Sequence, residues 1–134
     1  MRTNKFSIFI VGIVLLFSIL ACGGSVSTAN IGDAWISSDQ DGENRTTTFE
    51  QDAIIYAQVD LRNAPNDTTI KAAWLTVQVE GTEPDFVINE TEIVTGSGVV
   101  HFDLSNSNLW PVGSYKVDLY MNGELAQTLT FIVQ

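Results

Sequence analysis

Apolar side chains at every second position are the feature that most constrains this chain. The alternation runs through residues 57–61, 100–104, 115–121 and 129–133, with mostly polar or charged residues between the apolar ones. Successive side chains of a β-strand point to opposite faces, so each segment has one apolar face for a core and one polar face for water. Past residue 31 no segment shows a convincing helical period. The sequence therefore predicts an all-β domain built from antiparallel sheets.

Turn-forming residues separate the alternating segments. Asn122-Gly123 joins two of them and can adopt the positive φ angles of a tight hairpin, so residues 114–121 and 124–133 should pair. Further turns are expected at residues 63–67, 80–85 and 96–98. Seven strands result, and this number suits a sandwich of two sheets. We expect them over residues 34–37, 54–61, 69–79, 86–93, 99–104, 114–121 and 125–133.

The predicted strand over residues 69–79 does not reveal its core face. Its apolar side chains form two competing sets, because consecutive positions are apolar in its second half. A β-bulge or burial of both faces would explain such a pattern. The two sets are Ile70, Ala72 and Trp74 on one face and Ala73, Leu75, Val77 and Val79 on the other.

Composition narrows the functional classes. The chain holds 45% hydrophobic residues, which excludes a disordered acidic tail, and its single cysteine excludes a disulfide-stapled scaffold. Six basic residues against sixteen acidic ones give a net charge of −10. Binding to nucleic acid requires Lys and Arg to neutralise phosphates, so we expect no nucleic-acid partner. A polybasic membrane-binding patch is excluded for the same reason.

The amino-terminal segment is typical of a secretory signal peptide. Arg2 and Lys5 precede an uncharged, mostly apolar run over residues 6–20, which ends at the small residues Ala21 and Cys22. The run is shorter than the stretch of about 20 apolar residues that a membrane-spanning helix needs. We therefore expect a signal peptide over residues 1–21. Because Gly, Ser and Thr dominate the next stretch, we expect a flexible tether over residues 22–30.

The end of this segment, Ile19-Leu20-Ala21-Cys22, resembles the lipobox of bacterial lipoproteins. The resemblance implies cleavage before Cys22, a diacylglycerol on its thiol and a membrane partner through that lipid anchor. Gly23 resembles the second residue of lipoproteins that are sent to an outer membrane where the host has one. In a host without one, the protein would stay on the outer face of the cytoplasmic membrane. Either way the expected location is the cell envelope, and loss of Arg2 and Lys5 would lower the net charge from −10 to −12.

The remaining chain resembles fibronectin type III and related immunoglobulin-like domains. Leu109-Trp110-Pro111-Val112-Gly113-Ser114-Tyr115 is similar to the corner before their sixth strand, where a Tyr hydroxyl bonds back to the chain upstream. By the same resemblance Trp74 corresponds to their core Trp. The stretch from Gly113 through Asn122-Gly123 to Val133 resembles the last hairpin of bacterial extracytoplasmic immunoglobulin-like modules. The resemblance implies a seven-stranded immunoglobulin-like antiparallel sandwich over residues 31–134, after a lipoprotein signal peptide.

No set of catalytic residues can be assembled from the sequence. His101, the single histidine, stands between apolar residues on a predicted strand and should point to solvent. A zinc site would need more His or Cys ligands than the chain offers. The sixteen acidic residues leave one enzymatic alternative open, a small cell-wall glycan hydrolase that uses paired carboxylates.

Two features suggest ligand sites. Asp39, Asp41 and Glu43 lie in an acidic loop that resembles the middle of a calcium loop, although an exposed turn is the favoured interpretation and we expect no other cofactor. Trp110 and Trp35 are candidate platforms for a sugar or a peptide. We favour the alternative that they plug an end of the sandwich.

The sequence as a whole favours a membrane-anchored extracytoplasmic lipoprotein that binds or scaffolds another molecule without catalysis. Its partner would be an unidentified extracytoplasmic protein or glycan. The alternatives are the glycan hydrolase and a calcium-dependent adhesion module. The candidate contact surfaces are the loops over residues 39–46, 63–67 and 105–113.

Overall fold

The computed structural model describes residues 28–134, and these residues form strands and turns without a helix. The predicted signal peptide, Cys22 and most of the predicted tether lie outside the described residues. In residues 28–134 no helix is long and apolar enough to cross a membrane. The strands are β1 (Asn30–Ser37), β2 (Thr48–Phe49), β3 (Ile55–Arg62), β4 (Thr68–Val79), β5 (Val87–Thr95), β6 (Gly98–Leu104), β7 (Gly113–Met121) and β8 (Glu124–Val133).

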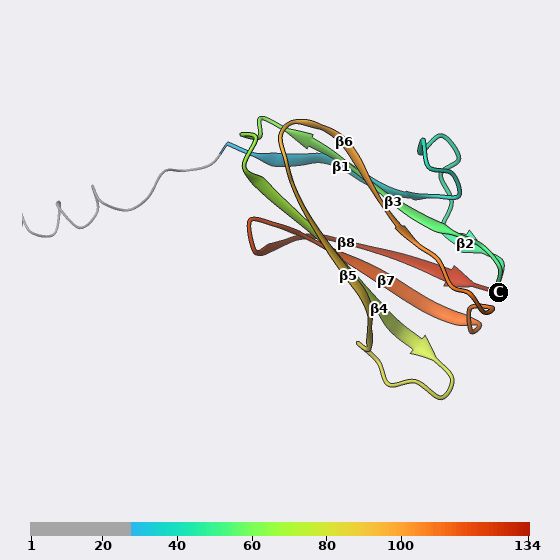
Figure 1. Cartoon of the computed structure of the whole chain (residues 1–134). Helices are drawn as coiled ribbons and strands as arrows, with labels where there is room; N and C mark the ends of the chain where they lie inside the picture. The colour runs from blue at the N-terminus through green and yellow to red at the C-terminus, as the bar shows by residue number, and fades with distance from the viewer. Residues whose placement is uncertain (1–27) are drawn as a thin grey trace, which may run out of the picture.

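The strands form two stacked sheets (Figure 1). One sheet has three strands in the order β1-β3-β6, and the other has five in the order β2-β8-β7-β4-β5. All pairs are antiparallel except β2 with β8, which is parallel. The expectation of an all-β sandwich is confirmed, but the number of seven strands is wrong, because the structure has eight. The additional strand, β2, has two residues and therefore shows no alternation in the sequence.

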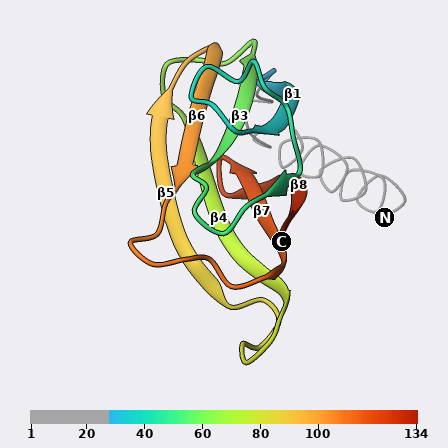
Figure 2. The ribbon, with the colours of Figure 1, turned by 90° about the vertical axis from the view of Figure 1, so that its right-hand side faces the viewer.

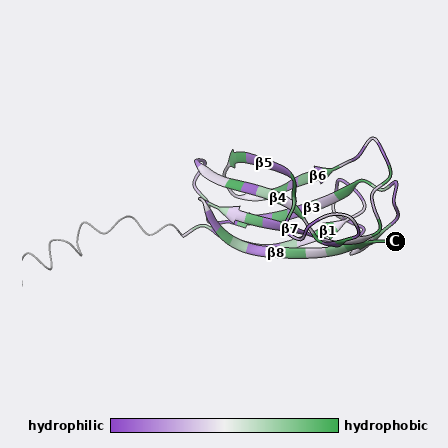
Figure 3. Cartoon of the chain, turned by 90° about the horizontal axis from the view of Figure 1, so that it is seen from below, coloured by the Kyte–Doolittle hydropathy of each residue, from purple (hydrophilic) through white to green (hydrophobic). Residues whose placement is uncertain are grey.

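The core lies between the inner faces of the two sheets. The alternation in the sequence puts apolar side chains there, and Figure 3 shows apolar and polar residues alternating along the strands. Trp74 is fully buried in this core, as its resemblance to the core Trp of such domains implies, and it meets Phe131 edge-on with ring centroids 6.0 Å apart.

Strand β4 buries side chains on both faces and also carries bulges. Ile70, Ala72 and Trp74 point into the core, while Ala73 and Leu75 are covered on the outer face. The pairing of β4 with β7 shifts between Thr76 and Gln78, which returns Val79 to the core. The two competing apolar sets in the sequence thus result from a bulge and from burial on both faces.

The two ends of the sandwich differ in their connections. At the entry pole, where the described chain enters β1, lie the turns over residues 63–67, 96–98 and 122–123 (Figure 1). At the far pole lie the carboxyl end and the longer connections over residues 50–54, 80–86 and 105–112 (Figure 2).

Hydrogen bonds that join the amino-terminal segment and the turns to one another hold the entry pole together. The Thr28 hydroxyl donates to the Asn63 carbonyl at 3.2 Å, and the Ala64 amide donates to the Ser97 hydroxyl at 2.9 Å. Asn122 adopts φ 51° and Gly123 φ 83°, the left-handed conformations that a two-residue hairpin requires. The predicted hairpin between β7 and β8 is therefore present.

Candidate functional site

Trp110 closes the far pole. Its indole N–H donates to the Ala53 carbonyl at 3.0 Å, and its backbone N–H donates to the Gln51 carbonyl at 2.7 Å. The Gln51 side chain returns a hydrogen bond to the Trp110 carbonyl at 2.9 Å. With 6% of its surface exposed, Trp110 is buried at this end of the sandwich, in keeping with the favoured interpretation that it plugs the end.

Tyr115 extends this plug into the core. Its hydroxyl donates to the Pro111 carbonyl at 2.5 Å, which is the bond that the resemblance to the sixth-strand corner implies. The Tyr115 ring stacks on Phe131 at 5.4 Å and meets Trp110 edge-on at 6.3 Å. Burial raises the pKa of Tyr115 above its usual range. Tyr115, buried below the connection between β6 and β7, therefore holds this connection in place through its hydrogen bond to Pro111.

The surface of the far pole carries exposed apolar side chains around this plug. Phe86 is 57% exposed, Leu109 62% and Val112 56%. Between the connections over residues 80–86 and 105–112 lies a pocket of about 160 Å³, whose wall includes Phe86, Trp110 and Tyr115. Near the entry pole, Val94, Val99 and Leu125 are similarly exposed, so the pocket and the longer connections, rather than exposure alone, distinguish the far pole.

The connection over residues 80–86 is held in a fixed place beside β4 and β7. The Thr76 hydroxyl donates to the Glu83 carbonyl at 2.8 Å and accepts the Phe86 amide at 3.1 Å. Lys116 forms an ion pair with Asp85 at 2.8 Å, and this hydrogen bond raises the pKa of Lys116. The apolar surface at the far pole is thus built on anchored loops.

The acidic loop lies over the outer face of the three-stranded sheet. Gln58, which is nearly fully buried there, donates to the Gln40 carbonyl at 2.9 Å and to the Ser37 hydroxyl at 3.3 Å. The Trp35 indole N–H donates to the Gly42 carbonyl at 2.9 Å. A Cβ at Gly42 would lie 2.8 Å from the Gln58 side chain, so only glycine permits the loop to approach Gln58 this closely. Gly42 also adopts a φ of 74°, which other residues disfavour.

The carboxylate of Asp39 shapes this loop. Its two oxygens accept the backbone N–H groups of Glu43 at 3.0 Å and Asn44 at 2.9 Å, so a local turn uses the side chain that was a candidate calcium ligand. Within residues 28–134, Asp39, Asp41 and Glu43 are not brought together in a group of three that could hold a metal ion.

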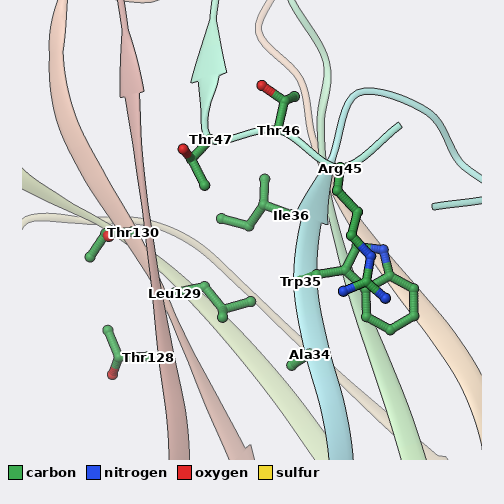
Figure 4. Close-up of a pocket in the computed structure, with 9 residues that line it drawn as sticks. All are labelled: Ala34, Trp35, Ile36, Arg45, Thr46, Thr47, Thr128, Leu129 and Thr130. Atoms are coloured by element: carbon green, nitrogen blue, oxygen red, sulfur yellow. The ribbon is translucent and has the colours of Figure 1, made fainter. Parts of the chain in front are cut away.

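A groove of about 550 Å³ lies between β1 and β8, the neighbouring edges of the two sheets. Figure 4 shows Ile36 of β1 and Leu129 of β8 pointing into the gap between the strands, with threonines along its sides. Trp35 lies at its margin, where the Arg45 guanidinium covers the ring at 4.1 Å from its centroid. Arg45 also pairs with Asp33 at 3.1 Å.

The structure separates the remaining candidates. His101 is exposed as expected, with Tyr56 beside it at 6.4 Å between ring centroids. Of the three candidate contact loops, residues 63–67 lie at the entry pole and residues 105–113 at the far pole, so they do not form one surface. Sequence reasoning predicted a turn at residues 80–85 but did not place it in a candidate site, and it missed the groove, because both sites depend on which strands become neighbours in space.

Comparisons with known proteins give the fold. No protein-family model matches the chain, and no curated protein matches it. Among solved structures, an immunoglobulin-like protein of Pseudomonas aeruginosa is similar over 83% of this chain and 100% of its own length. The two share 15% identity with a TM-score of 0.55.

Parts of two enzymes are also similar. An alkylpurine DNA glycosylase of Pseudomonas fluorescens matches 81% of this chain at 14% identity with a TM-score of 0.53, and a β-glucosidase of Listeria innocua matches 83% at 12% identity with a TM-score of 0.51. The chain spans 31% of the length of the first and 17% of the second, so their activities do not transfer. At these identities the likeness concerns the fold alone, and the fold is an immunoglobulin-like β-sandwich.

Proposed function

We propose that the protein is a lipid-anchored module of the cell envelope that binds another extracytoplasmic molecule through its far pole, without catalysis. The anchor is Cys22, in the lipobox-like segment Ile19-Leu20-Ala21-Cys22. The observation that supports the binding role is the arrangement of the sandwich. The chain enters at one pole, and the opposite pole carries the longer connections, a pocket of about 160 Å³ and the side chains of Phe86, Leu109 and Val112, each more than half exposed.

This arrangement suits recognition at a membrane. The flexible tether over residues 22–30 joins the domain at the entry pole, so this pole stays closer to the lipid on average than the far pole does. The acidic surface, with a net charge of −12 once residues 1–21 are removed, is repelled by anionic phospholipid, which disfavours a domain lying flat on the membrane. Two or more acyl chains at one residue anchor far more firmly than one, because each buried methylene contributes about 0.8 kcal/mol.

The anchor is tested by replacing Cys22 with Ser and following a fatty-acid label in cells. We expect Cys22→Ser to lose the label and to leave the membrane fraction. A Ser25→Ala variant, three residues along the chain, is the matched control and should keep both. Unchanged labelling of Cys22→Ser would contradict the anchor.

The binding surface is tested with a photo-crosslinking residue placed at Leu109 or at Val112 in intact cells, and at Asn66 of the entry pole as the control. We expect a discrete crosslinked product from the two far-pole positions and none from Asn66. The same products from Asn66, or none from Leu109 and Val112, would contradict recognition through the far pole.

A further inference from the structure

We propose that the groove between β1 and β8 binds an extended, basic segment of a partner protein as an added strand of the five-stranded sheet. The groove lies on the flank of the sandwich, away from the far pole. The proposal rests on three observations. Within residues 28–134, strand β2 fills part of the same gap, main-chain groups of β8 are unpaired along the rest of it, and the chain as a whole is strongly acidic.

The chain itself fills the far half of this gap with β2. Thr48 and Phe49 pair with Ile132 and Val133 in parallel, and the Ile132 amide donates to the Thr47 carbonyl at 2.8 Å. On the other side of the gap, the Thr46 amide donates to the Ile36 carbonyl at 3.1 Å. One extended segment thus contacts the edges of both sheets.

Beyond Thr46 the gap continues without a strand in it. The main-chain groups of alternate residues point to the same side of a strand, and those of Ile132 point toward β2. The N–H and C=O groups of Thr130 and Thr128 therefore point into the open half of the groove. In residues 28–134 no strand other than β7 pairs with this part of β8. Such an edge is a template for another strand.

The floor of the open half accepts side chains of an added strand. Ala34, Ile36 and Leu129 line it, so alternate side chains of a bound segment would reach apolar surface. The volume of about 550 Å³ is in the range of ligand sites in proteins. The chain's own segment in this gap is Thr46-Thr47-Thr48, which indicates that β-branched side chains fit there.

Charge selects the occupant. Within residues 28–134, Arg45 is the one charged residue that lines the groove, and its charge is offset by Asp33 of β1, so the field around the groove is set by the net negative charge of the chain. Arg45 is already engaged by Asp33 and by the Trp35 ring. A second copy of the chain brings the same large negative charge and is repelled, whereas a segment with Lys or Arg is attracted.

The test uses the full-length chain purified in detergent and a synthetic peptide of sequence Lys-Thr-Val-Thr-Val-Lys. We expect the peptide to slow hydrogen exchange at the amides of Thr128 and Thr130 and to leave those along the β5 edge unchanged. A peptide with Glu in place of Lys, and one with methylated main-chain nitrogens, should each bind on the order of tenfold more weakly.

The matched variants are Thr130→Pro and Thr130→Ala. Proline removes the amide that points into the groove and spares the bonds to β7, so Thr130→Pro should lose binding on the order of tenfold while Thr130→Ala keeps it. If Thr130→Pro fails to fold, the exchange pattern and the methylated peptide decide. No binding, exchange protection elsewhere, or protection of Thr128 and Thr130 by self-association without peptide would overturn the proposal. None of these results depends on Cys22.

Discussion

The two poles of this sandwich differ in how they connect strands across the end of the core. The entry pole uses tight turns, whose short hydrogen bonds involve main-chain groups and small polar side chains such as Ser97 and Asn122. The far pole uses longer connections, and Trp110 and Tyr115 close the core beneath them. Tight turns leave little surface for recognition, whereas the longer connections of the far pole line a pocket and expose Phe86, Leu109 and Val112. Under the proposed function, the entry pole is the attached end and the far pole is the contact end.

The largest difference between the poles is expected for Trp110→Ala. The change removes a buried indole together with its hydrogen bond to the Ala53 carbonyl, and it leaves a cavity at the end of the core. We expect the free energy of unfolding to fall by about 3–5 kcal/mol. Urea denaturation measures this loss. A loss below about 1 kcal/mol would mean that Trp110 lies on the surface rather than in the core.

A smaller effect is expected at the entry pole for Asn122→Ala. The change removes the side-chain oxygen that accepts the Thr69 amide at 3.0 Å and puts a residue that disfavours positive φ at 51°. We expect a loss of about 1–2 kcal/mol in the same denaturation experiment. Asn122→Gly is the control, since it loses the hydrogen bond but tolerates the backbone angle. Equal losses for the two variants would show that the angle contributes nothing.

The smallest effect is expected for Tyr115→Phe, which removes only the hydroxyl at the far-pole corner. We expect a loss of about 1 kcal/mol at neutral pH, because the exposed Pro111 carbonyl regains water as a partner. Denaturation of the two proteins at pH 7 measures the difference. No difference would show that the corner bond contributes nothing to stability.

The pH dependence of the same pair provides a second check. Burial raises the pKa of Tyr115 in the folded state, so the folded chain holds this proton more tightly than the unfolded chain does. This contribution is complete below the ordinary tyrosine pKa of about 10 and declines as the pH rises through the higher folded value. The wild type should therefore lose stability above about pH 10 more steeply than Tyr115→Phe. If the free energy of unfolding of the two proteins changed with pH in parallel, this explanation would be contradicted.

Sequence reasoning found the features that depend on neighbouring residues. Alternation located seven of the strands, Asn122-Gly123 located the hairpin, and the residues around Tyr115 identified the corner. It placed the start of β1 four residues late, at Ala34 rather than Asn30, because Gly32 and Asp33 interrupt the alternation where the pairing with β3 shifts register.

The candidate sites were harder to predict. In the acidic loop, the sequence shows the spacing of the acids but not that each oxygen of Asp39 accepts a backbone amide. The groove depends on β1 and β8 lying side by side in different sheets, and the far-pole pocket depends on two connections, residues 80–86 and 105–112, that are distant in sequence. Such features follow from topology and register, which local patterns do not specify.

The proposed orientation, with the entry pole near the membrane and the far pole away from it, is tested most directly by measuring the distance of each pole from the membrane. The acylated protein in liposomes would carry a fluorophore at Asn66 of the entry pole or at Asn106 of the far pole, and the lipid would carry a nitroxide on its headgroup. We predict strong quenching of the label at Asn66 and weak quenching of the label at Asn106. Equal quenching, or stronger quenching at Asn106, would contradict the orientation on which the proposed function depends.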